Sequence, residues 1–383
     1  RQRQMCIRDS AGTAGLSATV ALRAACAACF TSDLELARSQ VIQAQARCND
    51  LEELVRLVPL LTYLGAYDDC EHLLHERGLL DHAWGRQALF RVWRHRGEPN
   101  PWRALIPQQL WPQWSAELRQ WLSSPLAPVR VELVGGLGDA LENLALIEAS
   151  TSSTPLAAGL SYAPDPSAPA ALQALLPLLA PWFGKGEVGR TFTTPALRCG
   201  LCLQGWQRPP AELWPVSPYP RPRQWLVCWR CKPDLRNPLS SYSRSIDWDS
   251  LRAFLLNLQP RLAAAGARLL DLTAYRPAEQ RWLAAHVPSL QPVSDKIRSL
   301  ADTVALLRRC QGAITVDTSL VHLAALSAEP TTLLLPLFAD ERWQELLQPG
   351  SAYQQWVTPL RQQQFHSWSD PLQHLLHLFE DLV

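Results

Sequence analysis

Apolar side chains recur at every third or fourth position through residues 16–122, and this spacing predicts amphipathic helices that pack on one another. The clearest examples are residues 51–61, 67–74 and 82–93, each followed within a few residues by a glycine that can end a helix. No repeat of fixed length can be aligned along this stretch. We therefore predict a helical module over residues 11–125, either a solenoid fragment or an ordinary helical cap.

The pattern changes after Pro125 and Pro128, where short β-branched apolar runs begin to alternate with helical stretches. This alternation is typical of a doubly wound parallel sheet. We predict two α/β halves, residues 126–222 and 223–383, with the proline-dense segment 209–222 as the linker between them. The predicted strands are residues 129–134, 224–229, 268–272, 313–316 and 331–335, and the predicted helices are residues 140–149, 170–179, 248–265, 302–310, 320–327 and 372–382.

The first ten residues differ from the rest of the chain. Residues 1–10 match neither the helical nor the strand pattern that follows, and they resemble a translated sequencing adaptor. We expect this segment to be non-native and to take no part in the fold.

Charge is balanced in this sequence. It holds 36 lysines and arginines against 35 aspartates and glutamates, a formal net charge of +1, and the two signs are mixed along the chain. No basic stripe points to nucleic acid as a partner. Hydrophobic residues make up 47%, enough for a large core, yet no apolar run approaches the roughly 20 residues that span a bilayer. We expect a cytoplasmic protein without a transmembrane segment.

Two cysteine pairs, Cys199 with Cys202 and Cys228 with Cys231, have the Cys-x-x-Cys spacing of a zinc site. Neither pair carries the glycine- or lysine-rich turn that usually surrounds such a metal, and Cys228 lies within a predicted buried strand. Scattered unpaired cysteines also suit a reducing compartment. We expect buried thiols and no metal, and keep a zinc site as the alternative.

Asp317, Thr318 and Ser319 lie between a predicted strand and a predicted helix. The backbone N–H groups and the positive dipole end of that helix form a place where an anion can bind. His322 follows on the first helical turn, where it could donate to the same anion. An ordinary helix cap explains the same three residues, and a surface histidine explains His322.

Asp139 follows Gly135, Gly136 and Gly138 at a second strand-to-helix turn. Glycines let the backbone approach a ligand closely, and the helix dipole favours an ionised aspartate. The Gly-x-Gly-x-x-Gly fingerprint of dinucleotide cofactors is absent. Asp139 is thus either a functional carboxylate or a first-turn aspartate that only stabilises its helix.

Three patches resemble the bacterial family of ADP-heptose:lipopolysaccharide heptosyltransferases (glycosyltransferase family 9) and their tetratricopeptide-linked relatives. The resemblance is good over residues 223–383 and thinner over residues 129–150. The patches are the Gly-Asp turn at residues 135–139, the Arg-Ser-Ile stretch within residues 229–246, and the Asp-Thr-Ser, Leu-Leu-Leu-Pro and Asp-Glu-Arg-Trp motifs within residues 317–343. The resemblance implies a GT-B fold, a pair of Rossmann-type halves, and it makes the helical module a candidate degenerate tetratricopeptide region.

The resemblance also implies a reaction, the transfer of a sugar from a nucleotide-diphosphate sugar by inverting displacement without metal or cofactor. Asp139 would take the proton from the acceptor hydroxyl. Arg244, Ser245 and Lys232 would stabilise the leaving diphosphate, and Arg342 with Trp343 would line the cleft beside the base or ribose. The implied substrate-binding residues are Gly136, Gly138, Lys232, Arg244, Ser245, Asp317, Thr318, Ser319, His322 and Arg342.

The acceptor, a glycan, a lipid-linked molecule or a protein, is expected between residues 129–222 and the helical module, which could also hold a protein partner. A second hypothesis is a non-catalytic scaffold that carries a degenerate glycosyltransferase domain. The proline-rich region 151–222, which is lean for a complete α/β domain, favours this alternative.

Overall fold

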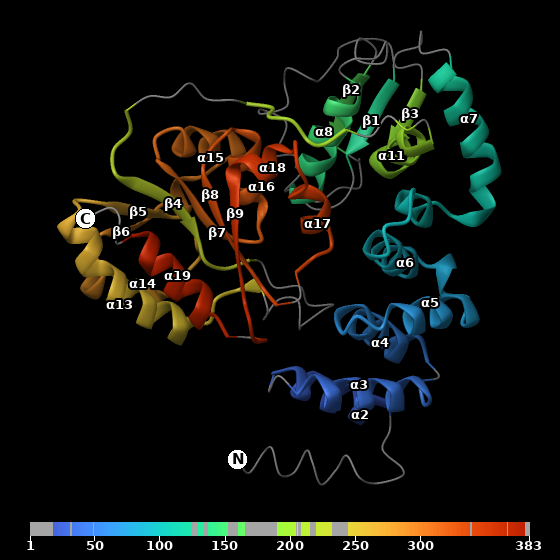
Figure 1. The fold of residues 1–383 in the computed structure, drawn as a ribbon, viewed down its shortest axis with the longest axis horizontal. Coiled ribbons are helices and arrows are strands. Elements are labelled where there is room, and N and C mark those ends of the chain that lie inside the picture. Colours follow the sequence, from blue (N-terminus) through green and yellow to red (C-terminus); the bar gives the residue numbers. More distant parts are fainter. Residues whose placement is uncertain are drawn as a thin grey trace.

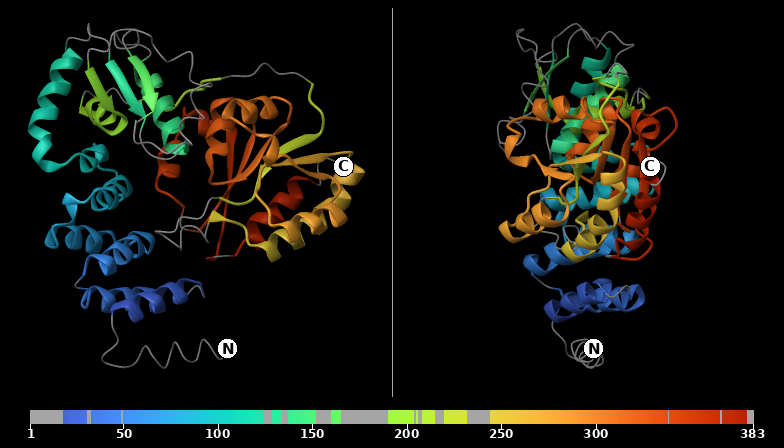
Figure 2. Two further views of the ribbon diagram at one scale, coloured as in Figure 1. Left: turned by 180° about the vertical axis from the view of Figure 1, so that it is seen from behind. Right: turned by 90° about the vertical axis from the view of Figure 1, so that its left-hand side faces the viewer.

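The computed structural model describes three regions: an N-terminal helical module, an N-terminal α/β half and a C-terminal α/β half (Figure 1). The helices of the module form a column beside the C-terminal half, and the N-terminal half lies at one end of this column (Figure 2). The described residues are 18–30, 33–48, 50–123, 129–133, 137–151, 160–164, 190–203, 205, 208–214, 220–231, 244–337, 339–365 and 367–379.

The helical module confirms the helices predicted within residues 16–122. Asp33 and Asp50 cap two of them, each carboxylate accepting a backbone N–H three residues on, at 3.1 and 2.8 Å. The apolar faces of the helices between residues 18 and 95 share one core around Leu57, Leu61 and Leu74. The tetratricopeptide relationship stays a prediction. The helices are α2 (Ala18–Phe30), α3 (Leu34–Gln45), α4 (Leu51–Tyr63), α5 (Tyr67–Glu76), α6 (Ala83–His95) and α7 (Trp111–Ser123), with short 3₁₀ turns η1 (Leu79–Asp81), η2 (Pro101–Leu105) and η3 (Gln108–Leu110).

The N-terminal half contains three parallel strands in the order β2-β1-β3. These are β1 (Val129–Leu133), β2 (Leu160–Pro164) and β3 (Arg190–Thr193), and the half also holds α8 (Leu137–Thr151) and α11 (Thr194–Leu203). The first predicted strand and helix are confirmed. Because α8 begins at Leu137, Gly138 and Asp139 lie in its first turn. The helix predicted at residues 170–179 lies outside the described residues.

The C-terminal half contains six parallel strands in the order β6-β5-β4-β7-β8-β9. In chain order this is 3-2-1-4-5-6, the order of dinucleotide-binding folds, which reverses between β4 and β7. The strands are β4 (Gln224–Cys228), β5 (Arg268–Asp271), β6 (Leu290–Pro292), β7 (Gly312–Val316), β8 (Thr331–Leu335) and β9 (Val357–Arg361). The helices are α13 (Trp248–Ala264), α14 (Pro277–His286), α15 (Leu300–Leu307), α16 (Ser319–Leu326), α17 (Arg342–Leu346), α18 (Ala352–Trp356) and α19 (Ser369–Leu378), with the 3₁₀ turn η6 (Ser294–Lys296).

Alternate residues of the central strands supply two separate cores. Leu226 and Ala313 belong to a cluster that includes α16 and continues into Leu141 of α8, so the two α/β halves share it. The next residues along the same strands, Val227 and Ile314, pack on the other face against α13 and α19. Opposite pointing of successive side chains in a strand accounts for this division. The result is the GT-B-like pair of halves, preceded by helices, that the sequence predicts.

The described part of the predicted linker lies against the C-terminal half. The N–H groups of Leu213 and Trp214 both donate to the carbonyl of Leu326, each at 2.9 Å, and Ala352 donates to the carbonyl of Pro210 at 2.8 Å. This segment is therefore hydrogen-bonded to the end of α16 and to the start of α18. Among the described residues, no helix is both long and apolar enough to cross a membrane.

Candidate functional site

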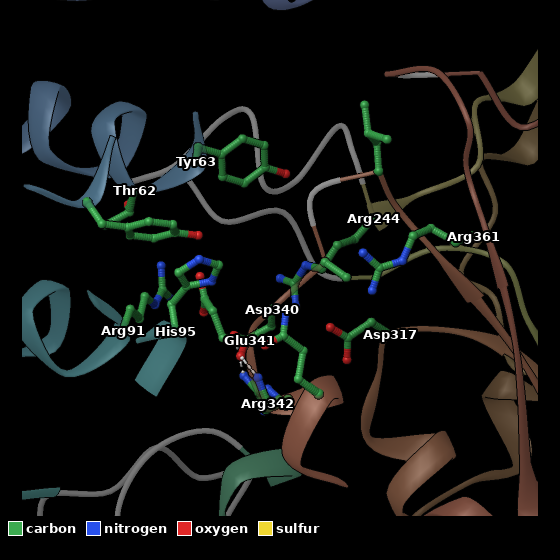
Figure 3. A pocket seen from close by; sticks show the side chains of 14 residues that line it. Thr62, Tyr63, Arg91, His95, Arg244, Asp317, Asp340, Glu341, Arg342 and Arg361 are labelled. Carbon is green, nitrogen blue, oxygen red and sulfur yellow. Dashed lines mark hydrogen bonds and ion pairs between the residues drawn. The ribbon is translucent and has the colours of Figure 1, made fainter. Parts of the chain in front are cut away.

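A cavity of about 260 Å³ lies where the carboxyl ends of β7, β8 and β9 meet the helical module; we call it the sheet cavity (Figure 3). Open α/β sheets bind their ligands at this edge. Arg244, Arg361 and Asp317 line it from the C-terminal half, and Figure 3 shows them opposite side chains of α4 and α6. The cavity is therefore formed jointly by two regions that are far apart in sequence.

Asp317 places a carboxyl group at the end of β7, in the wall of the sheet cavity. The residue is 4% exposed, and burial raises the pKa of its carboxyl group, with Arg342 and Arg244 acting in the opposite direction. Ligand binding by Asp317 stays a prediction. The carboxyl group of Asp317 is thus buried and interacts electrostatically with Arg342 and Arg244.

Arg244 and Ser245, predicted as a pair, have different surroundings. Arg244 lines the sheet cavity, and its Nε is buried without a hydrogen-bond partner in the described part of the chain. Ser245 does not line the cavity, because its Oγ accepts the N–H of Cys231 at 3.1 Å and its carbonyl accepts Trp368 Nε1 at 3.1 Å. Ser245 therefore joins the two ends of the loop that follows β4. Lys232, in that loop, lies outside the described residues.

Thr318 is the N-cap of α16. Its Oγ1 accepts the N–H of Leu320 at 3.3 Å and shares a hydrogen bond with Thr315 Oγ1 at 3.0 Å. The N–H of Leu320, at the helix start where an anion is predicted to bind, is thus satisfied within the helix. Ser319 follows Thr318 and occupies the first helical position. The binding of phosphate by Thr318 and Ser319 stays a prediction.

His322 is buried and does not line the sheet cavity. Its Nδ1 lies 2.8 Å from the hydroxyl of Tyr353, and its ring stacks on Trp343 with centroids 5.6 Å apart. Burial, with Arg342 nearby, lowers its pKa to about 3, so the imidazole is neutral. Trp343, predicted on the cleft wall, is only 1% exposed; that expectation is wrong because the indole fills the space beside His322.

Gly138 touches His322 across the boundary between the two α/β halves. A Cβ added to Gly138 would lie 3.0 Å from both Cδ2 and Nε2 of His322. The glycine is needed for close packing of α8 on α16, whereas its place in a glycine-rich turn predicted a close approach to a ligand. Gly136 lies outside the described residues.

Arg342 connects the site to the N-terminal half. Its Nη1 donates to Asp139 Oδ1 at 2.6 Å and lies 3.6 Å from Glu142, and its Nη2 donates to Asp340 at 2.9 Å. These carboxylates raise the pKa of Arg342 well above its ordinary value despite burial, which acts against them. The predicted cleft residue Arg342 therefore bonds directly to the predicted base Asp139.

A second cavity, of about 360 Å³, lies between α6, η2 and α8; we call it the helix cavity. Asp139 and Asn143 line it from the N-terminal half, and Phe90 and Trp102 line it from the helical module. Asp139 and Asp317 thus lie in different cavities. The two cavities adjoin, because Arg91, Asp340, Glu341 and Arg342 line both.

Arg94 of α6 ties all three regions together. Its Nη2 lies 3.0 Å from Glu142 of α8 and 2.5 Å from Glu345 of α17, and Glu345 also lies 3.2 Å from Arg198. The side chains of Arg94 and Glu142 are almost fully buried, so this pair has little access to water, whereas the side chain of Glu345 is 33% exposed. Sequence reasoning missed Arg91, Arg94 and Arg361. Arg91 and Arg94 are three residues apart on one helix and therefore lie on the same face of it, and this spacing could have indicated a cationic surface.

The four cysteines of the zinc hypothesis do not form a metal site. Cys199 and Cys202 lie on α11, whereas Cys228 and Cys231 lie at the end of β4. None of these four cysteines forms a disulfide. Across the described ranges, which include these cysteines, no group of three or more His, Cys, Asp or Glu side chains could hold a metal ion. The zinc hypothesis is therefore wrong.

No family model and no curated protein matches this chain. Among solved structures it is similar to ADP-heptose LPS heptosyltransferase II of E. coli, with 13% identity and a TM-score of 0.39 over 66% of this chain and 99% of that chain. It is also similar to E. coli heptosyltransferase WaaC with ADP, with 12% identity and a TM-score of 0.40 over 67% and 100% of the two chains. WaaC with ADP-2-deoxy-2-fluoro heptose gives 14% identity and a TM-score of 0.38 over the same shares. These solved structures are heptosyltransferases, the family that the sequence resembles; at such scores the likeness says nothing about substrate or activity.

Proposed function

We propose that the protein is a glycosyltransferase that moves a sugar from a nucleotide-diphosphate sugar to a hydroxyl of a glycan, a lipid-linked molecule or a protein. One observation carries the proposal: an arginine-lined cavity at the carboxyl edge of a parallel sheet adjoins a second cavity that holds Asp139. Transfer needs an anion site for the leaving group and, beside it, a base for the acceptor. Adjoining cavities with these linings supply both.

The donor diphosphate would bind in the sheet cavity. Arg244 and Arg361 both line this cavity, so it offers two cationic groups to a doubly charged ligand. Fixed cations aimed at the diphosphate stabilise the charge that builds on it as it leaves, so no metal is required. Thr318, Ser319 and Lys232 would complete the anion site.

The acceptor would bind in the helix cavity, between the helical module and α8. Asp139 would take the proton from the acceptor hydroxyl, and its ion pair with Arg342 would fix the carboxylate beside the donor. Attack from the side opposite the leaving group inverts the configuration at the sugar carbon. The position of Arg342 on both cavity walls agrees with this arrangement.

A second candidate is a non-catalytic scaffold that retains the fold. The observation in its favour is that Arg342 is already paired with Asp139 and Asp340, so the charges of the proposed site neutralise one another. A scaffold needs only the shared core and the charged network of Arg94. It predicts no nucleotide binding.

Thermal unfolding with ADP, GDP, UDP and their sugar conjugates, in the presence of EDTA, tests the proposal. A ligand at 100 times its Kd should add about 2.7 kcal/mol to the free energy of unfolding. Arg361→Ala should weaken this effect, whereas Arg281→Ala, an exposed arginine of α14 outside both cavities, should not. Stabilisation that appears only with added magnesium or manganese contradicts the metal-free mechanism, and no stabilisation by any of these ligands favours the scaffold.

A further inference from the structure

The wall of the sheet cavity that belongs to the helical module is aromatic. Tyr63, at the end of α4, and Tyr67, at the start of α5, both line it, together with His95 of α6. The rings of Tyr67 and His95 stack with centroids 3.9 Å apart and an interplanar angle of 23°. The two stacked rings together form one aromatic platform on this wall.

Polar groups surround this platform. Arg91 and Glu341 line the same cavity, and the pKa of the Tyr67 hydroxyl is raised to about 12 by burial and by the nearby Glu341, so it remains a donor. Figure 3 shows Thr62, Tyr63, Arg91 and His95 on the side opposite Arg244, Arg361 and Asp317. The cavity thus has an aromatic, hydrogen-bonding side and a cationic side.

We propose that the platform of Tyr67 and His95 binds the glycosyl group of the donor, so that the helical module selects the sugar. The apolar C–H face of a sugar ring packs on an electron-rich aromatic face, while its hydroxyls both donate and accept. A carboxylate, a guanidinium and a phenol beside the rings, those of Glu341, Arg91 and Tyr67, match this need. The proposal rests on the proposed function, because it assumes a nucleotide sugar in the sheet cavity.

The position of the platform favours contact with the sugar of the donor rather than with its nucleotide base. The reacting carbon must lie between the leaving diphosphate and Asp139, hence on the side of the sheet cavity that adjoins the helix cavity. Arg91 and Glu341 line both cavities and border the platform, whereas Arg244 and Arg361 line only the sheet cavity. A diphosphate on Arg244 and Arg361 therefore puts its sugar toward Tyr67 and its base away from it.

Titration of Tyr67→Leu with ADP, GDP and UDP, and with ADP-glucose, GDP-mannose and UDP-glucose, separates the two parts of the ligand. We expect about a three- to tenfold weaker Kd for the nucleotide sugar and an unchanged Kd for the matching nucleoside diphosphate. Tyr67→Phe, which keeps the stack, should lose less. Trp84→Leu is the matched control, because Trp84 stacks on His82 in the same module and lines neither cavity.

His95→Ala gives the same test at an exposed position. Equal loss of both ligands would assign the platform to the base and overturn the proposal while leaving the proposed function intact. Unchanged affinity for both ligands in Tyr67→Leu and His95→Ala would also overturn it. Failure of the wild-type protein to bind any of the six ligands would overturn the proposed function and this inference with it.

Discussion

Arg342 donates a hydrogen bond to Asp139 at 2.6 Å, from α17 of the C-terminal half to α8 of the N-terminal half. The two residues are 203 positions apart in the sequence. Their ion pair brings the proposed base to the boundary between the two cavities, so a change at either residue can affect both chemistry and the relative position of the halves.

Asp139→Asn should leave donor binding intact and reduce sugar transfer by about 10²–10⁴-fold, because the amide keeps the shape of the side chain but cannot accept the proton. Initial transfer rates and thermal unfolding of the same variant are the measurements. Asp249→Asn, at an exposed first-turn aspartate of α13, is the control. Wild-type transfer with a small loss of stability would show that Asp139 only stabilises its helix and its contact with Arg342.

Arg94→Met should lower the free energy of unfolding by about 3–5 kcal/mol, because it leaves Glu142 buried beside a more distant Arg342. Arg96→Met is the matched control two residues on. Arg96 pairs with Asp68 and Glu71 at the surface, where such pairs contribute below about 1 kcal/mol. Urea unfolding of the two variants gives the comparison, and equal losses would argue against a structural role for the buried network.

Gly138→Ala should destabilise the protein by about 1–3 kcal/mol, because the new methyl group meets the His322 ring at 3.0 Å. His322→Ala removes that ring and should relieve the clash. The double variant should therefore be more stable than the sum of the two single losses implies, with a coupling of about 0.5–3 kcal/mol. Strictly additive losses would mean that α8 and α16 separate easily at this contact.

Stability should depend on His322 below neutral pH. Its pKa is about 3 when folded and about 6.5 when unfolded, so the unfolded chain takes up the proton first. The stability that the neutral ring contributes is complete above about pH 6.5 and is lost as the pH falls toward 3, by up to about 1.4 kcal/mol per pH unit.

Asp271 has the opposite effect on the pH dependence of stability. Burial raises the pKa of its carboxyl group to about 6, so as the pH falls the folded state binds this proton before the unfolded state does. The test therefore compares the pH dependence of stability in the wild-type protein with that of a variant at His322. His322→Gln removes the contribution that rises with pH, so the slope of the free energy of unfolding against pH between pH 5 and 7 should be lower than in the wild-type protein. An identical slope in the two proteins would mean that the pKa of His322 is the same in the folded and unfolded states.

The sequence predicted the central strands well and the edge strands poorly. β7 and β8 are short apolar runs without proline, and their predicted limits differ from the observed ones by at most one residue. β6 ends at Pro292 and β9 contains Pro359, and proline is tolerated at the edge of a sheet but weakens a strand prediction. Arg361 was missed because β9 was missed.

The candidate site was predicted only where its residues follow a strand. Asp317 lies directly after β7, so a strand prediction places it at the sheet edge. Tyr67, Arg91 and Arg94 reach the site through the packing of a helical module on a distant sheet, and helical periodicity shows only that such residues face outward. The burial of His322 and Trp343 depends on Tyr353, which no local pattern connects to them.

The pair of Arg94 and Glu345 has a consequence for the order of folding. The two residues are 251 positions apart, and Glu142 lies between them in sequence. During synthesis the helical module emerges first and can form its own apolar core, but Arg94 must wait for α17 before its charge is fully matched. Closing such a long loop is slow. The sheet cavity and the helix cavity should therefore be among the last features of the molecule to form, after each region has folded separately.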